Sequence, residues 1–216
     1  MRPRVTLKLA TSLDGRIATA SGESKWITGE AARAEGHRLR ATHDGIMVGI
    51  GTALADDPLL TVREPGLEDR QPTRIVMDSR QRLSPDSNLA RTAAESPVLV
   101  MTLQLPSPAL VRAGVEVIQV HSGRNGRVSL PHALTILRER GLISLLVEGG
   151  GEIATSFLRA DAVDRIEWFR APILLGAEGR PGIGSLAVER LGEARRFRRL
   201  AVEPCGDDLW ERYERL

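Results

Sequence analysis

Cysteine is nearly absent from this sequence of 216 residues, in which Cys205 stands alone. A single cysteine excludes an internal disulfide and any metal site built from several cysteines. We interpret Cys205 as a packing or surface residue rather than as a nucleophile. The four histidines are scattered along the chain without the spacing of metal ligands, so we expect no metal site.

Long apolar runs are missing as well. Hydrophobic residues make up 42% of the chain, but no uninterrupted apolar stretch is long enough to cross a bilayer. The first residues, Met1-Arg2-Pro3-Arg4, lead into a strand pattern without the apolar stretch of a signal peptide. We therefore expect a cytoplasmic protein that does not contact a membrane.

Aromatic residues and an excess of charge of one sign are also scarce. Aromatic side chains make up 3% of the residues, the net charge is only +2, and acidic residues are interspersed among the basic ones. A nucleic-acid partner is not expected, because such proteins use basic surfaces and aromatic stacking platforms. Lys8 and Lys25 are the only lysines. Either a coding preference for arginine explains this, or the position of Lys8 requires an ammonium group.

Several catalytic signatures are absent. The chain has no H-x-E and no C-x-x-C, which excludes a zinc deaminase. It has no G-x-S-x-G and no P-loop, which argues against a serine hydrolase and an ATPase.

Short β-branched runs alternate with helical patterns along the chain. This alternation predicts a largely parallel sheet with helices on both faces, and two runs near the C-terminus predict an antiparallel hairpin. We expect one domain over residues 1–216. The predicted strands are Val5–Ala10, Gly45–Ile50, Arg74–Met77, Val98–Thr102, Val115–Val120, Ile143–Val147 and Ile166–Leu174, and those of the hairpin are Phe197–Glu203 and Leu209–Tyr213. The predicted helices are Gly29–Ala41 behind an N-cap at Thr28, Leu130–Arg140 with Gly141 as a stop, and Gly151–Ala160.

A glycine turn, Glu148-Gly149-Gly150-Gly151, follows the predicted strand Ile143–Val147 and precedes a helix. Glycines let a backbone approach a ligand closely, and the free N–H groups of a helix N-terminus favour a phosphate. A plain tight turn is the alternative, but three consecutive glycines cost conformational entropy that such a turn does not require. The turn does not match G-x-G-x-x-G, the dinucleotide fingerprint.

Two other strand ends are candidates for ligand binding. A second glycine turn, Val48–Thr52, is followed by the paired acids Asp56 and Asp57, which either end a helix or bind ribose hydroxyls or substrate. The third exit is Asp78-Ser79-Arg80. An acid there suits a free 2′-hydroxyl, whereas Ser79 with Arg80 suits a 2′-phosphate, and an ordinary polar loop is equally compatible.

Four ordered motifs together resemble a known family. They are S-L-D-G-R from Ser12, S-G-E-S-x-W-I-T from Ser21, G-x-G-T-x-L-x-D-D-P-x-L-T-V-R from Gly49, and the late E-G-G-G. In this order they are similar to the pyrimidine reductase of riboflavin biosynthesis, which in bacteria is usually the C-terminal half of a bifunctional deaminase–reductase. The resemblance covers about Val5 to Tyr213, and the zinc signature of the deaminase half is missing, so no deaminase domain is expected.

The resemblance implies a dihydrofolate-reductase-like three-layer sandwich, with a mixed, mostly parallel central sheet, and usually a homodimer. It implies NADPH as the cofactor and a phosphorylated pyrimidine, 5-amino-6-(5-phosphoribosylamino)uracil, as the substrate that is reduced at ribose C1′. Hydride transfer belongs to the cofactor, while the protein supplies position and electrostatics.

Matching motifs also imply the site residues. The candidates for NADPH binding are Ala10, Trp26, Thr52, Asp56, Ser79, Gly150, Gly151, Glu152, Ile153, Ala154, Thr155 and Ser156. The candidates for substrate binding are Ser24, Arg40, Leu60, Arg63 and Glu148. Arg40 and Arg63 can grip a phosphate bidentately. The catalytic candidates are Lys8, Asp56 and Glu148, among which the proton donor stays open.

Other hypotheses remain. A reductase of the same fold acting on the diamino pyrimidine precursor, or on another pterin-like substrate, would share the glycine turn. A non-catalytic nucleotide-binding module would have no use for the Lys8–Arg16 block.

Overall fold

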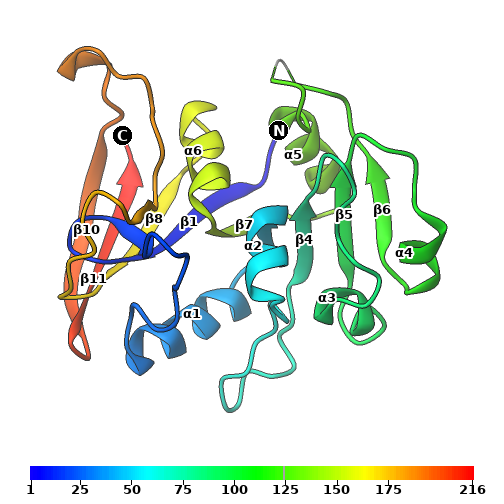
Figure 1. The fold of residues 1–216 in the computed structure, drawn as a ribbon, viewed down its shortest axis with the longest axis horizontal. Coiled ribbons are helices and arrows are strands. Elements are labelled where there is room, and N and C mark those ends of the chain that lie inside the picture. Colours follow the sequence, from blue (N-terminus) through cyan, green and yellow to red (C-terminus); the bar gives the residue numbers. More distant parts are fainter. Residues whose placement is uncertain (124) are drawn as a thin grey trace. The chain divides into compact units, whose positions relative to one another are not determined.

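A computed structural model describes residues 1–123 and 125–216 (Figure 1). The chain forms two compact units. The first unit comprises Met1–Arg4 and His37–Leu146, and the second comprises Val5–Gly36 and Val147–Leu216. The single domain expected for residues 1–216 stays a prediction. Among the described residues, no helix combines the length and the apolar character that crossing a membrane requires.

In the first unit, four strands pair in parallel in the order β3-β4-β5-β6. The three strands β3, β4 and β5 consist mainly of valine, isoleucine, leucine and methionine, because strands inside a parallel sheet are buried on both faces, whereas the edge strand β6 buries only Ile118. The strands are β3 (Gly45–Gly49), β4 (Thr73–Met77), β5 (Val98–Thr102) and β6 (Glu116–Gln119). The helices of this unit are α2 (Ile50–Asp56), α3 (Asn88–Arg91), α4 (Pro108–Arg112) and α5 (Leu130–Glu139).

One face of this sheet packs against α2, α3 and α4. Alternate strand residues, among them Ile46, Val76 and Val100, form a buried cluster with Ala53 of α2 and Leu89 of α3. The predicted helix Leu130–Arg140 is confirmed as α5: Ser129 is its N-cap, and Gly141 just beyond its end has φ +88°.

In the second unit, β1 (Arg4–Thr11) pairs in parallel with β8 (Arg165–Arg170), and β8 pairs antiparallel with β11 (Asp208–Arg215). The edge strand β10 (Phe197–Cys205) completes the predicted C-terminal hairpin with β11. Both strands of the hairpin are longer than predicted. A two-stranded ribbon of β2 (Arg16–Ala18) and β9 (Arg180–Pro181) was not predicted.

Three further elements contain or directly follow a point at which the chain passes from one unit to the other. Helix α1 (Glu30–Ala41) and strand β7 (Ser144–Gly149) cross it, and α6 (Gly151–Arg159) follows β7 in the second unit. The N-cap predicted at Thr28 is wrong, because α1 begins at Glu30 and Gly29 precedes it. The Gly29 N–H donates instead to Asp208 Oδ2 at 2.7 Å, so a carboxylate from β11 satisfies a donor at this helix start.

Several other boundaries differ from the prediction, most of them by one residue, and three of the differences bear on the candidate site. The predicted turn Val48–Thr52 contains the start of helix α2. Strand β7 continues through Glu148 and Gly149, and β8 ends at Arg170 rather than at Leu174.

Gly45 is the tightest glycine of the first unit and yields a test of the packing. A Cβ at this position would lie 2.7 Å from Leu142 Cδ2 and 2.9 Å from Ile75 Cδ1. We expect Gly45→Ala to lower the free energy of unfolding by about 1–3 kcal/mol, as overpacking does. In the control Gly51→Ala, on α2, the new Cβ meets nothing within 4 Å. That change should alter stability by less than about 1 kcal/mol, in the stabilising direction. Urea unfolding measures both, and equal effects would contradict the packing.

Candidate functional site

Helix α2 places two candidate residues on one side of the first unit. Thr52 is half-buried and Asp56 is exposed, and they are four residues apart in the same helix. Residues at this spacing lie on the same helical face. The structure therefore brings Thr52 and Asp56 together, because the expected turn is a helix.

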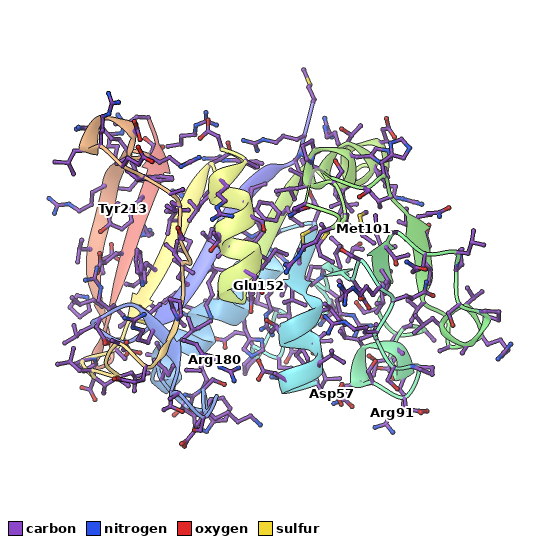
Figure 2. The ribbon with its side chains drawn as sticks, turned by 45° about the horizontal axis from the view of Figure 1, so that its top comes forward. Asp57, Arg91, Met101, Glu152, Arg180 and Tyr213 are labelled. Atoms are coloured by element: carbon purple, nitrogen blue, oxygen red, sulfur yellow. The ribbon has the colours of Figure 1, made fainter. Side chains whose placement is uncertain are left out.

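Asp57, the partner of Asp56 in the sequence, ends α2. It has the left-handed φ of +39°, and its carboxylate Oδ1 accepts a hydrogen bond of 2.9 Å from the Asn88 N–H at the start of α3. Figure 2 labels Asp57 at this end of the helix. Of the two interpretations of the paired acids, Asp57 fits the helix end, while the exposed carboxylate of Asp56 is directed to solvent.

The exit of β4 holds Asp78 and Ser79. Asp78 is fully buried, and its Oδ2 accepts a 2.8 Å hydrogen bond from the Leu83 N–H. A buried carboxylate that accepts a hydrogen bond within its own loop is not placed to bind a ribose. The interpretation of Asp78 as a partner of a free 2′-hydroxyl is therefore wrong. The half-buried Ser79 Oγ accepts a 3.0 Å hydrogen bond from the Val128 N–H, and its hydroxyl hydrogen can still be donated to a ligand.

The segment between α2 and β4 contains two substrate candidates and is held by a buried arginine. Arg74 is fully buried on β4, and its guanidinium donates to the carbonyl oxygen of Leu59 at 3.0 Å and to Thr92 Oγ1 at 2.7 Å. Burial lowers the pKa of Arg74. Leu60, which follows Leu59, is buried and has a φ of +55°. A leucine adopts this left-handed conformation at a cost of about 1–3 kcal/mol.

Further side chains hold the next residues of this segment. The Arg40 guanidinium donates to the Thr61 carbonyl oxygen at 2.9 Å. The Gln71 amide pairs with both backbone groups of Val62, accepting from its N–H at 2.9 Å and donating to its carbonyl at 3.0 Å. Arg63, directly after these held residues, is exposed.

The glycine turn in the second unit begins inside a strand. Glu148 is half-buried in β7, Gly149 has a φ of +126°, and the peptide bond between Gly149 and Gly150 is cis. Glycine is required at position 149, because side chains rarely tolerate this φ. Gly149 itself is buried, although a Cβ there would meet nothing within 4 Å.

Gly151 is needed for a different reason. A Cβ on this residue would collide with the carbonyl oxygen of Pro181. The Gly184 N–H donates to Thr155 Oγ1 at 2.7 Å, and the Gly182 N–H donates to the carbonyl oxygen of Gly15 at 2.9 Å. We call residues 179–184 the strap, which lies between the β1–β2 turn and the start of α6. The entropy argument for the three glycines thus needs correction, because Gly151 serves internal packing.

The remaining candidates on α6 differ in exposure. Glu152, labelled in Figure 2, and Ser156 are exposed, whereas Ile153, Ala154 and Thr155 are buried. For the buried three, a ligand at this helix would meet the backbone rather than the side chains.

Lys8 and Ala10 lie on one face of β1, next to β8. In the register of these strands, Lys8 pairs with Glu167 and Ala10 with Phe169, and Lys8 Nζ lies 5.7 Å from the centroid of the Phe169 ring. Glu167 is 2% exposed, and burial raises the pKa of its carboxyl group. The indole Nε1 of Trp210 donates to Glu167 Oε2 at 2.7 Å, which opposes that rise.

Ser24 and Trp26 line one pocket of the second unit, together with Ile27, Ile173 and Leu175 among others. The Trp26 side chain is 71% exposed, and the Arg33 guanidinium lies 4.5 Å from the centroid of its ring. The open indole face is compatible with the expected contact to a flat ring.

A carboxylate anchors one wall of this pocket. Asp14 accepts hydrogen bonds from Ser12 Oγ at 2.6 Å, from the Leu175 N–H at 3.2 Å and from the Gly176 N–H at 2.8 Å. The hydrogen bond from Ser12, followed by those from the two backbone groups, lowers the pKa of Asp14 to about 2. Ser12 and Asp14 belong to the S-L-D-G-R motif, which therefore fixes a loop.

The two units hold different candidates. The first unit contains Arg40, Thr52, Asp56, Leu60, Arg63 and Ser79. The second contains Lys8, Ala10, Ser24, Trp26, Glu148 and residues 150–156. Sequence reasoning missed Arg74, Gln71 and the strap. The glycine-rich composition of residues 176–184 is the one sequence signal that pointed to the strap.

The pKa of Asp14 gives a pH-dependent prediction. Because its pKa in the folded chain, about 2, lies below the usual 3.8, its contribution to stability is present above about pH 4 and lost as the pH falls toward 2. Asp14→Asn should destabilise the chain at pH 6 but not at pH 2, as measured by urea unfolding. Ser12→Ala should move the loss to higher pH. If Asp14→Asn lowers the free energy of unfolding by the same amount at pH 6 and at pH 2, the assignment is wrong.

Comparisons with known proteins identify relatives of the chain. The family model of the RibD C-terminal domain matches residues 3–210. The riboflavin biosynthesis protein RibD of Actinobacillus pleuropneumoniae is 39% identical over 212 residues, which are 96% of this chain and 56% of that protein. The chain thus spans little more than half the length of this curated relative.

Solved structures agree with the sequence comparison. A structure of Acinetobacter baumannii RibD superposes with a TM-score of 0.87 at 32% identity, covering 100% of this chain and 58% of that one. The diaminohydroxyphosphoribosylaminopyrimidine deaminase/5-amino-6-(5-phosphoribosylamino)uracil reductase of Thermotoga maritima gives a TM-score of 0.83 at 29% identity, covering 100% and 57% of the two chains. The expected dihydrofolate-reductase-like fold is confirmed. The chain belongs to the RibD C-terminal domain family.

Proposed function

We propose that this chain catalyses the NADPH-dependent reduction of 5-amino-6-(5-phosphoribosylamino)uracil to the 5-phosphoribitylamino product in riboflavin biosynthesis. Membership of the RibD C-terminal domain family supports this activity, and the name of the Thermotoga maritima relative includes this reductase. The observation that carries the proposal is the ordered segment from Leu59 to Arg63, which ends in an exposed arginine of the matching motif.

The substrate phosphate is assigned to arginine side chains. Arg63 is exposed, and its guanidinium has five donors in a planar fork that matches a phosphate. Arg40 donates to the Thr61 carbonyl oxygen through Nη1, and its other guanidinium donors suit the same anion. Ser24 supplies a hydroxyl donor. Leu60, whose side chain is packed in the core, contacts the substrate through its backbone. Glu148 accepts from hydrogen-bond donors of the pyrimidine or the ribose.

The described residues fit a nicotinamide cofactor. A Cβ at Gly149 would meet nothing within 4 Å, and the start of α6 presents N–H groups of the kind that bind phosphates. We assign the pyrophosphate to Gly150 and the first turn of α6, residues 151–156. The matching motifs assign further cofactor contacts to Ala10 and Trp26 in the second unit, and to Thr52 and Asp56 in the first unit. Ser79, with the exposed Arg80 beside it, suits the 2′-phosphate of NADPH.

The reaction divides the work between cofactor and protein. When bound, NADPH supplies a hydride for C1′ of the ring-opened ribose. The chain's own residues hold the open sugar and deliver a proton to the atom next to C1′, so that charge balances. Lys8, Asp56 and Glu148 are the candidates for that proton. Lys8 also suits the role of steadying substrate oxygens, because its ammonium group offers three donors.

The alternative candidate for the substrate is the diamino pyrimidine precursor, which differs by one exocyclic group. An assay that offers the two pyrimidines separately, with NADPH oxidation as the readout, decides between them. The family resemblance also supports a homodimer, which light scattering of the purified chain tests.

Arg63→Ala tests the substrate assignment. Loss of a charge-assisted grip worth about 1.5–3 kcal/mol should raise the KM for the phosphorylated pyrimidine about 10- to 100-fold, with NADPH binding largely kept. Steady-state kinetics and a fluorescence titration with NADPH measure the two effects. The control is Arg70→Ala, an exposed arginine of the same loop, which should leave the KM unchanged.

Two results would contradict the assignment. If Arg63→Ala abolishes NADPH binding and leaves the substrate KM as it was, the roles of the residues are misassigned. If the unaltered chain binds NADPH but turns over neither pyrimidine, it is a binding module rather than a reductase.

A further inference from the structure

His37 contacts the backbone of the proposed phosphate-binding residue. Its ring nitrogen Nδ1 accepts a hydrogen bond of 3.1 Å from the Arg63 N–H. The two residues are 26 positions apart in the sequence. His37 is half-buried on α1, and no motif resemblance assigns it a role.

The contact completes a series of side chains that hold consecutive residues. Arg40, three residues after His37 on the same helix, donates to the Thr61 carbonyl oxygen. Gln71 pairs with both backbone groups of Val62. His37 then fixes the N–H of Arg63, from whose Cα the exposed guanidinium side chain departs. A shift of this backbone moves the guanidinium relative to the phosphate that it is proposed to bind.

The contact depends on the protonation of the imidazole. A neutral histidine with its proton on Nε2 has an acceptor at Nδ1, whereas the imidazolium has N–H groups at both positions. Protonation would therefore turn an N–H of the ring toward the N–H of Arg63, and the two donors would repel each other. Among side chains, histidine is the one whose usual pKa places its change of charge near neutral pH.

Charged residues stand near His37 along α1 and beside its contact on the loop that follows α2. On α1 these are Arg33, Glu35, Arg38 and Arg40, and on the loop they are Arg63 and Glu64. Arg38 is paired with Glu64 at 2.8 Å.

We propose that His37 is a positioning residue that holds Arg63 in its phosphate-binding conformation while neutral and releases it when protonated. This proposal rests on the proposed substrate role of Arg63. It predicts that substrate affinity falls as the pH is lowered, while kcat at saturating substrate and NADPH binding change little.

Two substitutions of His37 test whether the hydrogen-bond acceptor at the Nδ1 position is what holds Arg63. In His37→Asn, the amide oxygen on Cγ replaces Nδ1 and accepts at every pH, whereas His37→Gln carries its amide one atom farther out and leaves the Nδ1 position without an acceptor. The substrate's own phosphate titrates near pH 6 in every variant, so comparison among variants cancels it.

The experiment measures KM and kcat at pH 8 and pH 6 for the unaltered chain and for both variants. We expect the rise in KM from pH 8 to pH 6 to be about fivefold or more larger in the unaltered chain than in His37→Asn. His37→Gln should show a raised KM at both pH values. Amide hydrogen exchange at Arg63, which needs no substrate, should be faster in His37→Gln and match the unaltered chain in His37→Asn.

The outcomes distinguish this proposal from the function on which it rests. Arg63→Ala is measured in parallel. If Arg63→Ala raises the KM but His37→Gln does not, the positioning role is overturned while the function stands. If Arg63→Ala leaves the KM unchanged, the substrate assignment fails, and this proposal fails with it. The positioning role is also overturned if the amide hydrogen of Arg63 exchanges at the same rate in the unaltered chain and in both His37 variants. It is likewise overturned if both His37 variants lose thermal stability to the same extent and their KM does not change.

Discussion

Backbone polar groups removed from water must find hydrogen-bond partners, and residues 59–63 have no helix or strand to supply them. Their partners are side chains from other elements of the first unit. Arg74 binds the Leu59 carbonyl, Arg40 binds that of Thr61, Gln71 binds both groups of Val62, and His37 accepts from Arg63. The position of the proposed phosphate-binding group is thus set largely by residues that need not touch a ligand.

Much of the fold follows from local sequence. The strand Val98–Thr102 is predicted to the residue, because a buried strand of a parallel sheet is an unbroken run of apolar side chains. Helix α5 is predicted from Pro131 near its start and Gly141 after its end. Helix α2 was missed because Gly49 and Gly51 disfavour a helix locally, whereas burial of Ala53 in the core stabilises one. The β2–β9 ribbon is too short to leave a pattern in the sequence.

For the candidate site, motif resemblance named residues but not what supports them. Ser24 and Trp26 line one pocket, and Thr52 and Asp56 share a helical face, as the close spacing of each pair in the sequence allows. The contact between His37 and Arg63 joins residues 26 apart, and nothing local to either residue indicates it. Contacts between residues far apart in the sequence depend on the tertiary fold, so they cannot be predicted from the local sequence around either residue.

The close approach of Gly151 to the strap has a consequence for how this family can vary. The atom that a Cβ at 151 would strike is the main-chain oxygen of Pro181, so no choice of side chain at 181 relieves the collision. Relief requires another path for the chain between β8 and β10. Relatives that carry a side chain at this position should therefore also differ in the length of that connection. The residue at position 151 and the connection between β8 and β10 are therefore expected to change together in evolution, although more than two dozen positions separate Gly151 from Pro181.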